Sequence, residues 1–161
     1  MSAQVGQKMP VGTLYRRGDS GLEEIATEGL FTQRTVVIFA VPGAFTPTCS
    51  DEHLPGFIVN ADALRAAGVD EIICLAVNDP FGMRAWAQAH DAQGAISFLS
   101  DGNGDWTQAL GMQRDMRKAA MGVRSKRYAM VVTDGVLTWL GVDESGLVNS
   151  RAEAVLAMLN A

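Results

Sequence analysis

The sequence predicts an α/β fold in which a central, mostly parallel sheet carries flanking helices and an edge hairpin. Two patterns lead to this prediction. Apolar runs of strand length alternate with segments of helical periodicity, as in parallel sheets that are buried on both faces. Closer to the C-terminal end, an Asp-Gly turn separates two strand patterns, which is a strong signal for an antiparallel hairpin.

The first strand and helix surround the most informative segment of the chain. Residues 35–41 are rich in β-branched side chains and read as a buried strand. Thr46 then offers a capping hydroxyl, and Pro47 is a favoured first helical residue, so we expect a helix to begin there. The helical spacing continues to about Gly68, and Pro55 should kink the helix.

The later elements continue the alternation. We expect strands at 71–77 and 96–99, a helix through 83–87, a hairpin from 128–132 and 136–140, and a last helix at 152–159. This order and length suit a thioredoxin-like arrangement. Since 161 residues are enough for one domain and no flexible linker interrupts them, we expect a single domain over 1–161.

Composition excludes several classes of protein. With 48% hydrophobic and 19% charged residues, the chain is not of the disordered type. A net charge of −5 argues against a nucleic-acid partner. Two cysteines are too few for a disulfide scaffold. Without a readable signal peptide or a run of ~20 apolar residues, we expect no membrane partner, a cytoplasmic location and reduced thiols.

Cys49 is the first candidate for chemistry. It lies in the first turn of the helix expected after the buried strand, where unpaired backbone N–H groups and the positive end of the helix dipole favour thiolate over thiol. The thiolate is the nucleophilic form, and Thr46 places a hydroxyl three residues earlier. The alternative is a buried cysteine that acts only as a small hydrophobic side chain.

The residues around Cys49 resemble a known signature. Residues 42–50, PGAFTPTCS, and residues 53–57, HLPGF, are similar to the active-site segment of peroxiredoxins of the type II group (the atypical fifth subfamily of thiol peroxidases). Two further blocks match in order, CLAVNDPF at 74–81 and KRYAMVV at 126–132. The resemblance extends from Pro42 to the hairpin, and it implies a thioredoxin fold and a peroxidase with roles in antioxidant defence and redox homeostasis.

The resemblance also implies roles for individual residues. Cys49 would be the peroxidatic nucleophile, attacking hydrogen peroxide or a small alkyl hydroperoxide and becoming a sulfenic acid. Thr46 would hydrogen-bond the thiolate and the peroxide, Arg127 would hold the thiolate charge and polarise the peroxide, and Pro42 would shield the sulfur. Without the resemblance, Arg127 is one of six cationic residues between positions 114 and 127.

Regeneration of the thiol leaves alternatives open. Cys74 matches the resolving cysteine of plant relatives, whereas its apolar strand also fits a cysteine that only fills the core. The segment 144–150, where other relatives carry a resolving cysteine, has none. Glutathione with glutaredoxin, or thioredoxin, would then reduce Cys49. The resemblance implies a homodimer and no cofactor. Two rival functions stay open: a peroxide-sensing signalling protein with little turnover, and a holdase-like interaction protein.

His53 suggests two other chemistries, which the spacing disfavours. A Cys–His hydrolase usually takes its two residues from separate elements, and no third orienting group is evident. Cys49, His53, Cys74 and His90 do not have the spacing of a structural zinc site. We therefore expect no metal, and we expect His53 to cap the pocket or to contact a second subunit.

Overall fold

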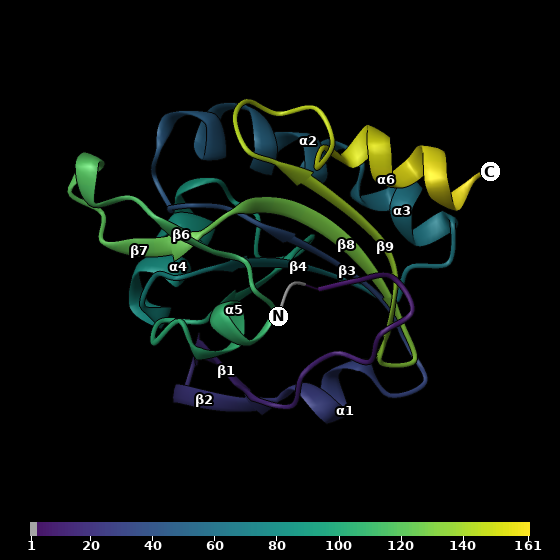
Figure 1. The fold of residues 1–161 in the computed structure, drawn as a ribbon, viewed down its shortest axis with the longest axis horizontal. Helices are drawn as coiled ribbons and strands as arrows, with labels where there is room; N and C mark the ends of the chain where they lie inside the picture. The colour runs from purple at the N-terminus through teal and green to yellow at the C-terminus, as the bar shows by residue number, and fades with distance from the viewer. Residues whose placement is uncertain (1–2) are drawn as a thin grey trace.

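The computed structural model describes residues 3–161 and shows a twisted mixed sheet between two layers of helices (Figure 1). Seven strands lie in the order β2-β1-β5-β4-β3-β8-β9. Their bounds are β1 Thr13–Gly18, β2 Gly21–Ala26, β3 Thr35–Ala40, β4 Glu71–Ala76, β5 Ser97–Ser100, β8 Arg127–Thr133 and β9 Val136–Asp143. Two short strands, β6 (Gln113–Asp115) and β7 (Val123–Ser125), form an arm that projects from the body (Figure 1).

The helices divide between the two faces of the sheet. Their bounds are α1 Thr27–Phe31, α2 Leu54–Val59, α3 Ala61–Ala66, α4 Pro80–Ala89, α5 Asp105–Ala109 and α6 Ala152–Leu159. Side chains of α2, α3, α4 and α6 pack in one apolar core, and those of α1 and α5 pack in the other. Within residues 3–161, none of these helices is both long and apolar enough to cross a bilayer.

The thioredoxin-like α/β arrangement and the edge hairpin of β8 and β9 are confirmed, but the sheet is mixed and not mostly parallel. Only β3, β4 and β5 pair in parallel in the described part of the chain. The sequence does not predict β1 and β2, which add antiparallel pairs at the opposite edge. Their apolar signal is weak because β2 is an edge strand with mostly exposed side chains.

The helix that carries Cys49 begins at Pro47, as predicted, and then widens. Residues Cys49–His53 form a π-helical turn, closed by a hydrogen bond from the Leu54 N–H to the Cys49 carbonyl. Pro55 lies at the start of α2, where it has no N–H to give to a regular helical ladder. The predicted irregularity is therefore present, in the form of a π turn, a feature that is frequent at functional sites.

Candidate active site

The loop between β3 and the π turn holds a strained backbone in a fixed position. Phe45 has a φ of 64°, a left-handed conformation that is uncommon for a large side chain. The Ala44 N–H donates to Asn78 Oδ1 at 3.0 Å, which ties this loop to the end of β4. The Thr46 hydroxyl donates to the Gly43 carbonyl at 2.6 Å. These bonds hold the loop in the conformation that places Cys49 beyond the C-terminal end of β3.

Arg127 reaches the Cys49 sulfur from the neighbouring strand. Its Nη2 donates to Cys49 Sγ at 3.1 Å, and both side chains are buried. In residues 3–161, no carboxylate forms an ion pair with Arg127. Because a buried guanidinium needs a compensating charge, the thiolate of Cys49 is the anion that suits this position. The contact thus places a cationic donor directly beside the cysteine sulfur.

Strand register explains why Arg127 reaches Cys49. β8 pairs antiparallel with β3, and Tyr128 lies opposite Ala40, so Arg127 stands beside the beginning of the active-site loop. Ala129 and Val131 belong to the same apolar core as Cys49, whereas Tyr128 and Met130 face the other core. Since side chains alternate along a strand, Arg127 points to the Cys49 face, and a slip of one residue would reverse it.

His53 is buried behind Arg127 and fixes its orientation. The His53 Nε2 lies 2.8 Å from the Ser150 carbonyl, an acceptor, so Nε2 carries the hydrogen. Nδ1 is then free to accept from Arg127 Nη1 at 2.8 Å. Burial, followed by the charge of Arg127, lowers the pKa of His53 to about 3, so the ring is neutral at physiological pH. At 1% exposure, His53 does not take the predicted surface role as a pocket cap or subunit contact.

Asp143 anchors the segment that holds His53. Its carboxylate accepts the backbone N–H groups of Val148, Asn149 and Ser150, and the Ser150 hydroxyl at 2.7 Å. Burial acts to raise the pKa of Asp143, but these hydrogen bonds outweigh it and the pKa is lowered. A continuous chain of contacts therefore runs from Asp143 through Ser150, His53 and Arg127 to the sulfur.

The other predicted site residues differ in their burial and in their contacts. Pro42 is buried next to Gly43 at the start of the loop. The Thr46 hydroxyl donates its hydrogen to Gly43, and within residues 3–161 it makes no hydrogen bond to Cys49 and accepts no capping bond. Cys74 is a free, fully buried thiol in the same apolar core as Cys49. Burial, and then the proximity of Cys49, raise the pKa of Cys74 well above its usual value.

The arm of β6 and β7 contributes contacts that the sequence does not predict. A Cβ added at Gly43 would lie 2.6 Å from Met121 Cε, so this methionine packs directly on the active-site loop. Arg124 Nε donates to the Met121 carbonyl at 2.7 Å, which places a second arginine beside the loop. Arg117, in contrast, is exposed and paired with Asp115. Among the cationic residues of this stretch, Arg127 is the one that contacts Cys49.

A metal centre has no support in the geometry. Among residues 3–161, no group of three or more His, Cys, Asp or Glu side chains is arranged to hold an ion. The two cysteines lie in the apolar core. His53 is buried, and both of its ring nitrogens are already hydrogen-bonded. The site instead consists of a buried cysteine sulfur, a guanidinium held beside it and a closely packed loop.

Comparison with known proteins places this site in a family. The redoxin family model matches residues 4–156. Peroxiredoxin-2C of Oryza sativa subsp. japonica is 42% identical over 157 residues, covering 96% of this chain and 97% of that protein. Chloroplastic peroxiredoxin-2E of Arabidopsis thaliana is 43% identical over 163 residues, covering 98% of this chain and 70% of the relative.

A solved structure agrees closely with the fold. Reduced Prx3 of Vibrio vulnificus in complex with H2O2 superposes with a TM-score of 0.94 at 46% identity, covering 99% of each chain. A redoxin fold, a buried cysteine in contact with an arginine and near-full-length peroxiredoxin relatives together identify a thiol peroxidase. The chain belongs to the redoxin family and, within it, to the type II peroxiredoxins.

The buried imidazole of His53 predicts a pH dependence of stability. Its pKa is lowered in the folded protein, so the unfolded chain binds more protons below pH 6.5, and stability is lost as the pH falls from there toward 3. At about 1.4 kcal/mol per pH unit, the wild type should lose about 2 kcal/mol between pH 7 and pH 5. Urea unfolding at both values measures this loss.

The matched control for that measurement is His53→Gln, which removes the titrating ring. Between pH 7 and pH 5, the stability of this variant should fall less than that of the wild type, and the difference between the two losses should be about 2 kcal/mol. The pair of pH values lies above the range in which most carboxylates titrate. An equal loss in both proteins would show that His53 is not the group responsible.

Proposed function

We propose that Cys49 reduces hydroperoxides and that Arg127 activates both the thiolate and the substrate. The observation that carries the proposal is the 3.1 Å hydrogen bond from Arg127 to the sulfur, made by a guanidinium without a carboxylate partner in residues 3–161. Hydrogen peroxide and small alkyl hydroperoxides suit the site, since Cys49 is fully buried and the loop around it is closely packed. The complex of the Vibrio vulnificus relative with H2O2 supports this substrate.

The chemical step follows from these contacts. The Cys49 thiolate attacks one peroxide oxygen, so an S–O bond forms as the O–O bond breaks. The leaving hydroxide or alkoxide takes a proton and departs as water or alcohol, and Cys49 becomes a sulfenic acid. Negative charge develops on the leaving oxygen, where a fixed donor stabilises it most. Arg127 provides such a donor, Thr46 orients the peroxide once its hydroxyl leaves Gly43, and Pro42 keeps water from the sulfur.

We further propose that thiols complete the cycle. Glutathione would displace water from the sulfenic acid to give a mixed disulfide, which glutaredoxin or a second glutathione would reduce; thioredoxin would reduce an internal disulfide. Cys74 is the candidate resolving cysteine for that second route. Its burial in β4 means that β4 or the π turn must open locally before a Cys49–Cys74 bond forms.

Mass spectrometry after one equivalent of peroxide tests this function directly. We expect one added oxygen atom on Cys49 without reductant, and a glutathione adduct on Cys49 when glutathione is present. An internal disulfide in the first sample would identify Cys74 as resolving. Recovery of unmodified protein together with unconsumed peroxide would contradict the proposal.

The roles of the two cysteines predict a difference between reductants. Cys74→Ser should keep most of its steady-state peroxidase rate with glutathione and glutaredoxin, because Cys49 alone can form the mixed disulfide. With thioredoxin as the sole reductant, the rate should fall if the internal disulfide is required. Coupled NADPH consumption measures both rates, and loss of activity with both reductants in a folded variant would contradict the first expectation.

We also propose that the protein forms a homodimer and is located in the cytoplasm. Phe45, Phe81 and Val148 are exposed apolar side chains, and Phe45 belongs to the active-site loop itself. We expect these exposed side chains to be covered in a homodimer, which sedimentation analysis would detect. A cytoplasmic location agrees with the predicted reduced state of both thiols, although the Arabidopsis relative is chloroplastic.

A further inference from the structure

A cavity of about 410 Å³ lies beside α4, separate from the active site. Its walls come from the turn that joins β1 to β2, from one side of α4 and from the start of β5. Cys49, His53 and Arg127 do not line it. Because β3, β4 and β5 run parallel, the start of β5 lies toward the opposite end of the sheet from Cys49, which follows the end of β3. The cavity is therefore not an extension of the peroxide site.

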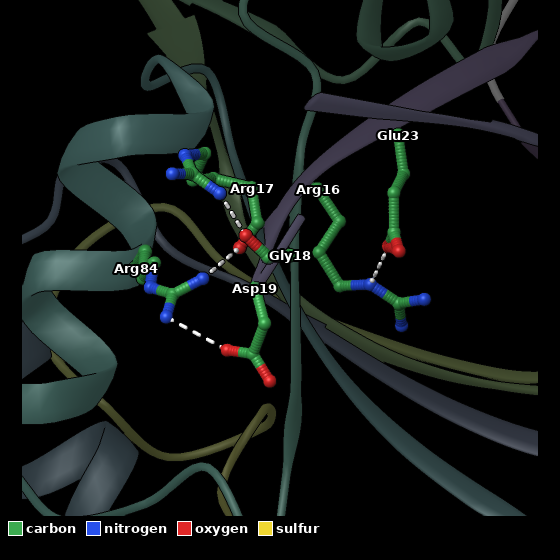
Figure 2. Close-up of polar contacts among 6 residues, drawn as sticks. All are labelled: Arg16, Arg17, Gly18, Asp19, Glu23 and Arg84. Atoms are coloured by element: carbon green, nitrogen blue, oxygen red, sulfur yellow. Dashed lines mark hydrogen bonds and ion pairs between the residues drawn. The ribbon is translucent and has the colours of Figure 1, made fainter. Parts of the chain in front are cut away.

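Three arginines, Arg16, Arg17 and Arg84, line this cavity together with two carboxylates (Figure 2). Arg16 pairs with Glu23 at 2.7 Å, and Arg84 pairs with Asp19 at 2.9 Å. Arg17 has no carboxylate partner in residues 3–161, and its Nη1 donates to the Gly18 carbonyl. The Asp19 side chain is 98% exposed, so solvent weakens its hold on Arg84. The lining carries a positive excess in a chain whose net charge is −5.

Most of the N–H groups on these arginines have no protein acceptor. A guanidinium has five donors, of which Arg17 uses one and Arg84 uses two within the described residues. Figure 2 shows the two groups close together on the side of α4. Planar forks of this kind match the oxygens of phosphate and carboxylate groups with paired hydrogen bonds.

The rest of the lining combines four apolar side chains with Gly18, Gln93 and Ser97. Pro80 and Ala87 of α4 face the cavity together with Ile96 and Phe98, which precede and begin β5. Cavities that bind small molecules usually combine such an apolar wall with a few charged groups that fix orientation. Arg84 itself is fixed by its second hydrogen bond, from Nη1 to the Arg17 carbonyl at 3.1 Å.

We propose that this cavity binds an organic anion, in which a phosphate or carboxylate group contacts Arg17 and Arg84 and a compact apolar group packs on Pro80, Ile96 and Phe98. Binding requires no change in Cys49. Because Cys49, His53 and Arg127 lie outside the cavity, a ligand bound there would not contact the peroxide site.

Calorimetric titration of the full chain with phenyl phosphate tests this proposal. We expect one ligand per chain, and binding about tenfold or more weaker in Arg17→Gln and in Arg84→Gln, since each loses charged hydrogen bonds. Arg117→Gln is the matched control, because Arg117 is an exposed arginine outside the cavity. Arg17→Gln should keep the wild-type peroxidase rate, which shows that the variant is folded and that the two sites are separate.

Three further probes define the ligand chemistry. Inorganic phosphate lacks the apolar group and phenol lacks the charge, so both should bind more weakly than phenyl phosphate. Phenylacetate replaces the phosphate by a carboxylate, and the tighter of the two charged ligands identifies the preferred anion. Any of three results would overturn the proposal. These are that neither charged ligand binds saturably, that Arg117→Gln weakens binding as much as the cavity variants do, or that inorganic phosphate binds as tightly as phenyl phosphate.

Discussion

Cys49→Ser should abolish peroxide reduction while the protein stays folded. Serine has nearly the size of cysteine, so it fills the same buried space, and its hydroxyl still accepts a hydrogen bond from Arg127. The reaction is lost because a serine hydroxyl is a weak nucleophile unless a base activates it. The imidazole of His53 has its Nδ1 occupied by Arg127 and its Nε2 by Ser150, so it offers no such base.

Single-turnover measurements distinguish this variant from one that fails only in regeneration. Wild type and Cys74→Ser should each consume one equivalent of peroxide in the absence of reductant, whereas Cys49→Ser should consume none. Near-ultraviolet circular dichroism, which reports on the packing of Trp86 and Trp106 in the two cores, checks that the fold is intact. Peroxide reduction by Cys49→Ser at the wild-type rate would remove the basis of the mechanism.

The sequence predicts the centre of the fold better than its edges. β3, β4 and β8 are buried on both faces and therefore appear as continuous apolar runs. β2 is exposed on most positions, and the arm of β6 and β7 pairs only with itself, so neither leaves a periodic apolar signal. The π turn is also hidden, because Pro55 marks an interruption of the helix without specifying its form.

Within the site, features set by neighbouring residues can be predicted from the sequence, whereas contacts between distant residues cannot. The position of Cys49 at a helix start is a local property, and the residues around it are sufficient to predict it. Arg127 and Cys49 are 78 positions apart, and His53 and Ser150 are 97 apart. Such contacts depend on the pairing of β8 with β3, so only the resemblance to peroxiredoxins singles out Arg127. Asp143 had one local signal, a strand end followed by Ser, Gly and Asn, which favours a hydrogen-bonded loop.

Replacement of Arg127 by Gln should slow the attack on peroxide by about a hundredfold or more, the usual loss when a donor to a developing negative charge is removed. The variant loses the positive charge beside Cys49 Sγ. In the proposed mechanism it also loses the donor that would polarise the leaving oxygen. Because His53 is neutral, it does not replace that charge. Stopped-flow measurement of the second-order rate with hydrogen peroxide gives the effect.

Two further substitutions separate the guanidinium from a general positive field. Arg127→Lys keeps the charge but not the pair of donors that contact His53 and Cys49, so its rate should lie between those of the wild type and the Gln variant. Arg117→Gln removes an exposed charge from the same basic stretch and should leave the rate unchanged. Arg124 is unsuitable as a control because it lies beside the loop at Gly43. If Arg117→Gln slowed the reaction as much as Arg127→Gln, the basic stretch would act through its summed field and the contact with Cys49 would have no special role.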